Sequence, residues 1–386
     1  MFHRLITPLE STSFFIFGAR GTGKTSFLRE FFKGKNVYWL DFLEPELEFS
    51  YSQNPSQLKQ ELDLRTGVEW VVLDEIQKVP SLLNVVHQLI ESTSLRFALT
   101  GSSARKLKKK GTNLLAGRAF LNTLYPLTSP ELADLFSLSQ VLQWGSLPKI
   151  YSLTSDIEKR AYLKTYTYTY LKEEIVSEQV IRKLEPFHRF LEIAAQSSGE
   201  ILNFTNIARD VGADPKTIQS YYQILEDTLI GFLLPAYHHS IRKQQRQASK
   251  FYLFDLGVKR ALENNLHSAV TPSTYGFGKL FEHFLITEIV HLNEYYRRDF
   301  RFYYLRTQNQ LEVDLIIERP GMPRALVEIK SSDQVDERDT KTLSLFLQDI
   351  KPSQGFCLSL DPRAKKIGNV HCLHWQEGLK EIGLID

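Results

Sequence analysis

The chain has 386 residues, of which 42% are hydrophobic and 24% are charged, and its formal net charge is +2. That length is enough for two or three domains that each bury a core of their own. The near-neutral charge excludes a protein that binds nucleic acid with its whole surface, so any such surface must be local. Two cysteines, Cys357 and Cys372, are too few for a disulfide scaffold and indicate a reducing compartment. Because no apolar run approaches the roughly 20 residues that a bilayer requires, we expect a cytoplasmic protein with no membrane contact.

The first predicted domain, residues 1–128, contains an apolar strand, a glycine-rich turn and a helix in the stretch SFFIFGARGTGKTSFLREFF. The turn fits G-x-x-x-x-G-K-[ST], in which glycines let backbone N–H groups point at phosphates and the helix start adds partial positive charge. Lys24 is expected to neutralise phosphate oxygens, and the Thr25 hydroxyl is expected to bind magnesium. The alternative is a glycine turn between an ordinary strand and helix. The residues expected to contact the nucleotide here are Gly18, Ala19, Arg20, Gly21, Thr22, Gly23, Lys24, Thr25 and Ser26.

A second apolar strand, in EWVVLDEIQKVP, ends in two adjacent acids, Asp74 and Glu75. In this position Asp74 would hold magnesium, and Glu75 would polarise the attacking water as a general base. A strand end that caps the next helix is the alternative. Behind a phosphate-binding loop, such a pair is typical of hydrolysing NTPases of the additional-strand class, so we expect ATP and Mg²⁺ as ligands.

A third strand, in RFALTGSSARKL, places Thr100 or Ser102 where a polar side chain could sense the γ-phosphate, and the sequence leaves open which one does so. Arg105 or Arg118 could act as an arginine finger, within the chain or from a neighbouring subunit. Of the two we favour Arg118, because the basic run 105–110 could equally contact a phosphate backbone or lie in solvent. A finger from a neighbouring subunit would imply a homo-oligomer.

Residues 129–235 are predicted to be a helical lid that ends in a winged helix-turn-helix. The stretch NFTNIARDVGADPKTIQSYYQILEDTLIGFLLPAY predicts helix, turn, helix and strand. Its second helix offers Lys216, Gln219 and Gln223 but no arginine, so it fits either a DNA-reading helix or a structural or protein-contact module. The basic loop SIRKQQRQASK, which ends at Lys250, could be a wing on the phosphate backbone or simply solvated.

Residues 236–386 are predicted to contain a core in the order helix, three strands, helix, strand. The helix carries Glu282, the second strand carries Asp314, and the third carries Glu328 and Lys330. Asp314 and Glu328 on paired strands can converge on one magnesium ion, and Lys330 lies on the same strand face as Glu328 because side chains alternate with period 2. There it could orient or deprotonate a water, with Glu282 completing the cluster. The alternative is a surface hairpin with ordinary charges.

The stretches GARGTGKT, WVVLDEI, LEDTLIGFLLPAY, GKLFEHFLITEI and ALVEIKSS together resemble a bacterial family of AAA+ ATP-binding proteins. Members carry a C-terminal domain of unknown function related to the PD-(D/E)XK nucleases. The resemblance implies an α/β protein with a P-loop AAA+ type ATPase domain, a helical lid with a winged helix-turn-helix, and a C-terminal restriction-nuclease-like α/β domain. It implies nucleotide, magnesium and base roles for Lys24, Thr25, Asp74 and Glu75, and a nuclease-type cluster of Glu282, Asp314, Glu328 and Lys330.

Two functions are compatible with these patterns. The first is an ATP-dependent and Mg²⁺-dependent nuclease acting on DNA, in which ATP gates the C-terminal site. The second is a nucleotide-switched DNA-binding or regulatory ATPase whose nuclease-like domain no longer cuts. ATP hydrolysis is common to both.

Overall fold

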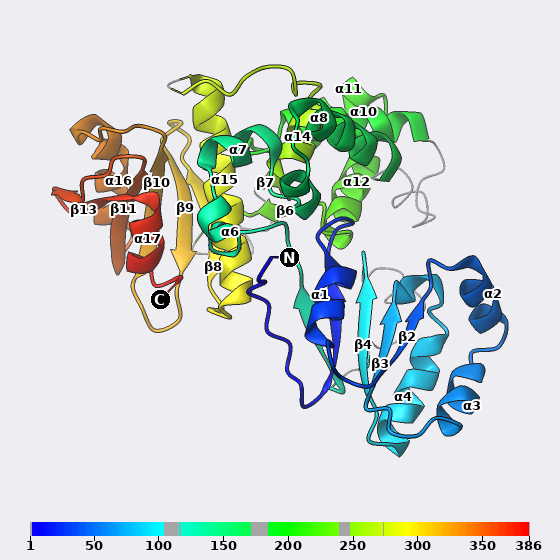
Figure 1. The fold of residues 1–386 in the computed structure, drawn as a ribbon. Helices are drawn as coiled ribbons and strands as arrows, with labels where there is room; N and C mark the ends of the chain where they lie inside the picture. Colours follow the sequence, from blue (N-terminus) through cyan, green and yellow to red (C-terminus); the bar gives the residue numbers. More distant parts are fainter. Residues whose placement is uncertain are drawn as a thin grey trace.

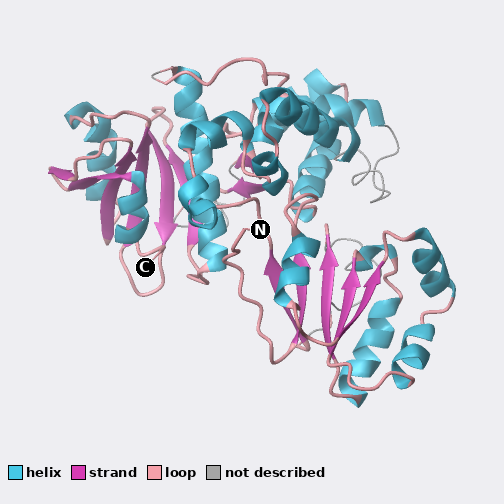
Figure 2. Cartoon of the chain, viewed as in Figure 1, coloured by secondary structure: helices cyan, strands magenta, loops and turns pink. Residues whose placement is uncertain are grey.

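The computed structural model describes residues 2–103, 115, 117–170, 184–238, 248–272 and 274–385. Figure 1 shows two α/β units on opposite sides of the molecule and a mainly helical unit that lies between and above them. Figure 2 shows the strands of the two large sheets as separate groups, with the short β6–β7 pair among the middle helices. The N-terminal unit carries the first group of motifs, and the C-terminal unit carries the Glu282 to Lys330 set.

The N-terminal sheet has five parallel strands in the order β2-β3-β4-β1-β5. Strand β4 lies between β1 and β3, which confirms the additional-strand arrangement. Helix α1 covers one face, and α3 and α4 cover the other, so the central strands are buried and almost wholly apolar. The elements are β1 (Ser13–Phe17), α1 (Lys24–Phe31), β2 (Val37–Asp41), α2 (Pro45–Gln53), α3 (Gln57–Asp63), β3 (Trp70–Asp74), η1 (Ile76–Lys78), α4 (Leu82–Ser92), β4 (Arg96–Gly101) and β5 (Ala119–Thr123).

The middle unit is built around one apolar core that helices α7, α8, α10 to α12 and α14 share with strand β7. Asn203 and Asp214 cap α11 and α12 by accepting hydrogen bonds from backbone N–H groups of the first turn. Strands β6 and β7 form an antiparallel pair. The elements are α6 (Ser129–Leu132), η2 (Ala133–Leu135), α7 (Leu138–Trp144), η3 (Pro148–Ser152), α8 (Asp156–Thr165), η4 (Tyr166–Tyr170), α10 (Leu184–Gln196), α11 (Phe204–Val211), α12 (Pro215–Asp227), β6 (Gly231–Leu234), β7 (Lys250–Leu253) and α14 (Leu256–Leu262).

The order helix, turn, helix, strand predicted for residues 203–237 is therefore confirmed, whereas its identity as a winged helix-turn-helix stays a prediction. The predicted boundary after residue 235 would separate β6 from β7. These strands pair, and α14 packs into the same core as β7. The division of the chain into domains stays a prediction.

The C-terminal sheet has six strands in the order β12-β13-β11-β10-β9-β8. Strands β8, β9 and β10 form an antiparallel meander, and β11 runs parallel to β10. Helices α15 and α17 pack on one face and α16 on the other. The elements are α15 (Tyr275–Tyr295), β8 (Arg301–Arg306), β9 (Glu312–Glu318), β10 (Arg324–Lys330), α16 (Glu337–Asp349), β11 (Ser353–Ser359), β12 (Lys365–Ile367), β13 (Val370–His374) and α17 (Trp375–Glu381). The predicted order helix, three strands, helix, strand is confirmed; a relation to nucleases stays a prediction.

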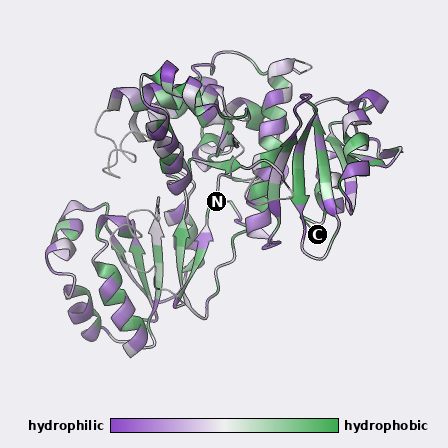
Figure 3. Ribbon diagram, turned by 180° about the vertical axis from the view of Figure 1, so that it is seen from behind, coloured by the Kyte–Doolittle hydropathy of each residue, from purple (hydrophilic) through white to green (hydrophobic). Residues whose placement is uncertain are grey.

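Hydropathy follows this layering, with hydrophobic residues along the strands and hydrophilic residues on the outer helices (Figure 3). Within the described parts of the chain, every helix is too short or too polar to cross a membrane.

Candidate functional site

The turn between β1 and α1 lies at the carboxyl edge of the parallel sheet. Different physical constraints require glycine at positions 18, 21 and 23 of this turn. Gly21 and Gly23 have φ values of +81° and +95°, a region that side chains with a Cβ rarely adopt. At Gly18 a Cβ would lie 2.3 Å from the carbonyl oxygen of Leu124, so the backbones approach too closely for any other residue. No side chain caps the start of α1, which leaves its first N–H groups available to an anion.

The two remaining residues of the motif face the acidic strand end. Lys24 is buried, and its Nζ donates to the Gly18 carbonyl at 2.8 Å and lies 3.8 Å from Glu75 Oε1. The Thr25 hydroxyl donates to Asp74 Oδ2 at 2.8 Å. Strands β1 and β3 end at the same edge of the sheet, which is why residues 49 positions apart meet. This arrangement gathers hard oxygen donors and one ammonium group beside the turn.

A polar chain connects the acidic pair to β4. The Thr100 hydroxyl donates to Asp74 Oδ1 and accepts from the Glu75 N–H at 3.0 Å. Gln77 reaches both the Glu75 carboxylate and the Ser102 hydroxyl. Burial raises the pKa of Asp74, while the hydroxyls of Thr100 and Thr25 lower it. Glu75 has a φ of 58°, a left-handed conformation that costs free energy in a non-glycine residue.

A cavity of about 540 Å³ adjoins the turn. Gly23, Ser26 and Phe27 border it from the start of α1, and Phe2 and Pro148 border it from the N-terminal segment and the middle unit. Its walls are mainly apolar. The cavity therefore continues the polar site into a space suited to a flat, weakly polar group.

Two contacts to the turn come from residues that the sequence did not single out for it. The Tyr166 hydroxyl donates to the Arg20 carbonyl at 2.7 Å. Arg4 donates to the Thr22 carbonyl at 2.7 Å and to the Glu131 carboxylate at 2.9 Å. No local pattern signals either contact, because each partner lies far away in the sequence.

The arginine-finger assignment to Arg118 is wrong for a finger within the same chain. Ala119 pairs with Ser13 at the beginning of β1, so Arg118 lies at the opposite end of that strand from the turn. Its side chain instead forms an ion pair with Glu91 on α4. A role towards a neighbouring subunit stays a prediction, and Arg105 lies outside the described residues.

The C-terminal unit brings the four predicted residues together. The Lys330 Nζ lies 2.7 Å from Glu328 Oε1, and Asp314 Oδ2 accepts a hydrogen bond from the Ile329 N–H at 2.7 Å. Burial raises the pKa of Asp314 well above its usual range, and the nearby carboxylates of Glu328 and Glu282 raise it further. Burial also raises the pKa of Glu328, against the effect of Lys330.

Lys250 is a member of this cluster, which corrects its assignment to a wing or a solvated loop. It is 2% exposed, and its Nζ lies 2.5 Å from Glu312 Oε1 and 3.4 Å from Glu282 Oε1. The Tyr252 hydroxyl also donates to Glu282, at 3.2 Å. The alternation of side chains along KFYL places Lys250 and Tyr252 on one face of β7, but only the tertiary structure directs that face towards α15.

The donor set of this cluster fits a divalent cation only in part. Glu328 Oε2 is buried and has no hydrogen-bond partner among the described residues, as expected of an oxygen that awaits a ligand. The Lys250 ammonium, however, already lies among the carboxylates. Within the described residues, no group of three or more His, Cys, Asp or Glu side chains is arranged to hold a metal ion.

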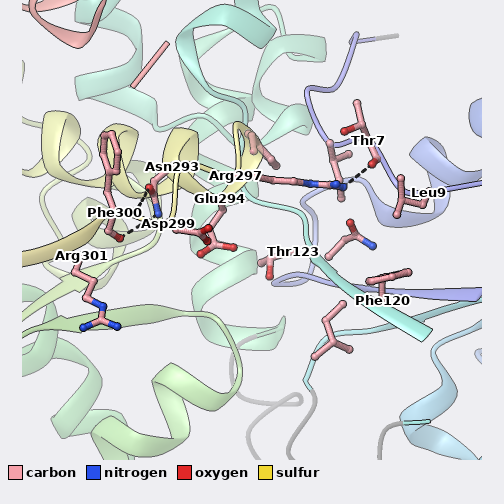
Figure 4. A pocket seen from close by; sticks show the side chains of 14 residues that line it. Thr7, Leu9, Phe120, Thr123, Asn293, Glu294, Arg297, Asp299, Phe300 and Arg301 are labelled. Carbon is pink, nitrogen blue, oxygen red and sulfur yellow. Dashed lines mark hydrogen bonds between the residues drawn. The ribbon is translucent and has the colours of Figure 1, made fainter. Parts of the chain in front are cut away.

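A separate cavity of about 740 Å³ lies between β5 and the turn after α15 (Figure 4). Asn293 pairs with the Phe300 backbone there, and Arg297 donates to the Thr7 carbonyl at 2.8 Å. None of the residues predicted for the nucleotide or the carboxylate cluster lines this cavity.

Comparison with protein families matches three successive parts of the chain. Residues 10–133 match an AAA domain, residues 135–269 match a domain of unknown function (DUF8612), and residues 277–377 match another domain of unknown function (DUF4143). The N-terminal unit is an AAA-type domain. That match agrees with the strand order and with the loop, acid and threonine geometry of this unit.

Relatives and solved structures are distant. An uncharacterized protein of Mycobacterium tuberculosis is 25% identical, covering 86% of this chain and 73% of its own length. An uncharacterized protein of Methanocaldococcus jannaschii is 23% identical, covering 94% of this chain and 83% of its own. The Walker-type ATPase of Pyrococcus abyssi aligns with 64% of this chain and 90% of its own, at 14% identity and a TM-score of 0.43.

Proposed function

We propose that the AAA-type unit binds ATP with Mg²⁺ and hydrolyses it. The observation that carries this proposal is the connected set of Thr25, Asp74, Thr100 and Glu75 at the end of β3, beside an uncapped helix start. The match of residues 10–133 to an AAA domain supports it.

The residues of the turn would divide the work on the triphosphate. Lys24 would exchange its bond with the Gly18 carbonyl for phosphate oxygens, and backbone N–H groups at the start of α1 would bind the same phosphates. The Thr25 hydroxyl and the Asp74 carboxylate would hold the metal ion, which when bound neutralises charge on the phosphates. The apolar cavity bordered by Phe2, Phe27 and Pro148 would receive the base.

Glu75 would act as the general base. Its carboxylate lies beside Lys24 and is held by Gln77, so it stands next to the expected phosphate position rather than in open solvent. A carboxylate at this place can accept a proton from the water that attacks the terminal phosphate. Thr100 would keep the pair in place through its bonds to Asp74 and to the Glu75 N–H.

The test is Glu75→Gln, with Glu381→Gln on the exposed end of α17 as the matched control. We expect the first variant to bind ATP within a few-fold of the wild type and to hydrolyse it about 10² to 10⁴ times more slowly. The control should hydrolyse ATP normally. A Glu75→Gln protein that hydrolyses ATP at the wild-type rate would exclude Glu75 as the base.

For the C-terminal unit we propose a second, metal-dependent function: cleavage of DNA gated by the ATPase. The buried, unpartnered Glu328 Oε2 beside Lys330 and Asp314 supports a site for a hard cation. Lys330 would orient a water or offset charge on the phosphate. The alternative is a nucleotide-switched DNA-binding or regulatory ATPase whose C-terminal unit does not cut, with the exposed residues Lys216 and Gln219 of α12 as contacts to DNA.

One assay separates these two functions. Plasmid and linear DNA are incubated with Mg²⁺ or Mn²⁺, with and without ATP, and the wild type is compared with Lys330→Ala. Lys366→Ala, at an exposed position on β12, is the control. Cleavage that is lost only in Lys330→Ala supports the nuclease. DNA binding without cleavage under either metal excludes it and leaves the regulatory ATPase.

A further inference from the structure

We propose that Lys250 is an internal cation that closes the C-terminal carboxylate cluster, so that a divalent metal ion binds there only after Lys250 withdraws. This inference rests on the proposed metal-dependent function of the C-terminal unit, because it concerns the same carboxylate cluster. It makes metal binding, and not cleavage, the property that Lys250 controls.

Lys250 reaches the cluster from a different structural unit. It is the first residue of β7, where it pairs with Leu234 of β6 and forms a bridge with Ile201. The next residue, Phe251, packs into the core of the middle unit. The Lys250 side chain points the other way and contacts Glu282 of α15 and Glu312 of β9. The ammonium group therefore joins the middle unit to the C-terminal unit.

The Lys250 ammonium group occupies a position where a metal ion would compete with it. Burial of Lys250 favours its neutral form, but the carboxylates of Glu282, Glu312 and Asp314 together raise its pKa, so it stays charged. A charged ammonium among these oxygens supplies the attraction that a hard cation would otherwise supply. A cation placed beside it would meet like-charge repulsion at close range.

Cationic side chains already pair with most carboxylates of the cluster. Lys330 pairs with Glu328, and at the rim Lys279 lies 4.0 Å from Glu282 and Arg306 lies 3.7 Å from Glu312. Lys279 lies closer to Glu200, at 2.9 Å. Together with Lys250, these cations already neutralise much of the negative charge on Glu282, Glu312 and Glu328.

A divalent ion would add two positive charges beside carboxylates that already have cationic partners. Glu328 Oε2, which has no hydrogen-bond partner in the described parts of the chain, is the remaining sign of an open ligand position. The geometry therefore supports a site that alternates between an ammonium and a metal ion.

The competition has a measurable consequence. When only a fraction of the molecules is competent to bind, the apparent affinity falls by that fraction. If Lys250 occupies the cluster in at least about nine-tenths of the molecules, its removal tightens metal binding by at least about tenfold. Lys250→Arg keeps the charge and should keep the metal excluded.

The experiment titrates Mn²⁺ into nucleotide-free full-length protein at constant ionic strength and measures free Mn²⁺ by electron paramagnetic resonance. Lys250→Met should bind one Mn²⁺ at least about tenfold more tightly than the wild type. The gain should disappear in Lys250→Met/Asp314→Asn and be absent in Lys250→Arg. A folded Lys250→Met protein with wild-type Mn²⁺ affinity, or a gain that persists in the double variant, overturns the proposal.

A second variant keeps the test decisive if Lys250→Met does not fold. Glu312→Gln removes the carboxylate at the shortest distance from the ammonium and affects a less buried side chain. We expect it to strengthen Mn²⁺ binding, because the hold on Lys250 weakens; weaker binding would show that Glu312 is merely a ligand and would overturn the proposal. ATP hydrolysis and DNA cleavage are measured in parallel, so that loss of either proposed function is seen separately from the Mn²⁺ result.

Discussion

Thr100→Val removes one hydroxyl from the polar chain at the end of β4 and nearly preserves the shape of the side chain. Thr100 is fully buried, and its hydroxyl donates to the Asp74 carboxylate and accepts from the Glu75 N–H. A hydrogen bond to a charged group contributes about 1.5 to 3 kcal/mol. Because that bond lowers the pKa of Asp74, its loss should raise the pKa.

The direction of the effect on activity follows from the charge that the metal site requires. Burial already raises the pKa of Asp74. Without the Thr100 hydroxyl, the carboxylate holds its proton to a higher pH and then cannot bind the metal ion. The acid limb of the pH profile of kcat/KM for ATP hydrolysis, which reports the free enzyme, should therefore move to higher pH.

The matched control is Thr228→Val, at a fully buried threonine of the middle unit whose hydroxyl donates to the Ile224 carbonyl at 2.7 Å. In chemical denaturation Thr100→Val should lose about 1.5 to 3 kcal/mol of stability, and Thr228→Val, whose partner is a neutral carbonyl, about 1 kcal/mol. Only Thr100→Val should shift the acid limb. An unshifted limb in Thr100→Val, or an equal shift in Thr228→Val, would refute the role assigned to this hydroxyl.

Two further predictions concern buried charges. Burial raises the pKa of Glu288 to about 7, against hydrogen bonds from Ser129. The folded state therefore binds more protons than the unfolded state between about pH 4.5 and 7. As the pH rises through that range, the free energy of unfolding should fall by on the order of 3 kcal/mol. In Glu288→Gln this decline should be smaller. The free energy of unfolding is measured by urea denaturation at several pH values, and an equal decline in the variant and the wild type would contradict the prediction. Arg4→Met leaves the buried Glu131 carboxylate without its partner and should cost about 3 to 5 kcal/mol; the exposed Arg338→Met should cost almost nothing, and similar losses in both would contradict the role of Arg4.

Much of the nucleotide site could be predicted from the sequence because its determinants are local. The glycines at 21 and 23 are required by the backbone of one turn, and Lys24 and Thr25 follow within the same turn of helix. The order of strands and helices in the C-terminal unit was also readable, since apolar alternation marks each strand separately. Asp314, Glu328 and Lys330 then meet because the two strands that carry them are paired neighbours.

Other assignments required information that lies outside any short stretch. The motif around Arg118 did not reveal that β5 runs parallel to β1, and that register places the arginine at the far end of the strand. The basic loop before β7 suggested solvent for Lys250, but the pairing of β7 with β6 turns the side chain towards α15 instead. Both errors arise because strand register and partner choice depend on packing between distant segments.

The sequence by itself determined the glycine-rich turn of the candidate nucleotide site, the acidic strand end and the set of carboxylates on the C-terminal helix and strands. Each of these depends on the conformation of a few consecutive residues or on the period of one strand. Only the tertiary structure decided that Arg4 and Tyr166 hold the glycine-rich turn, and that Lys250 lies inside the carboxylate cluster. The contacts of Tyr166 and Lys250 join separate units, and that of Arg4 joins the N-terminal segment to the turn. Their geometry is set by how buried cores pack against one another rather than by local preference.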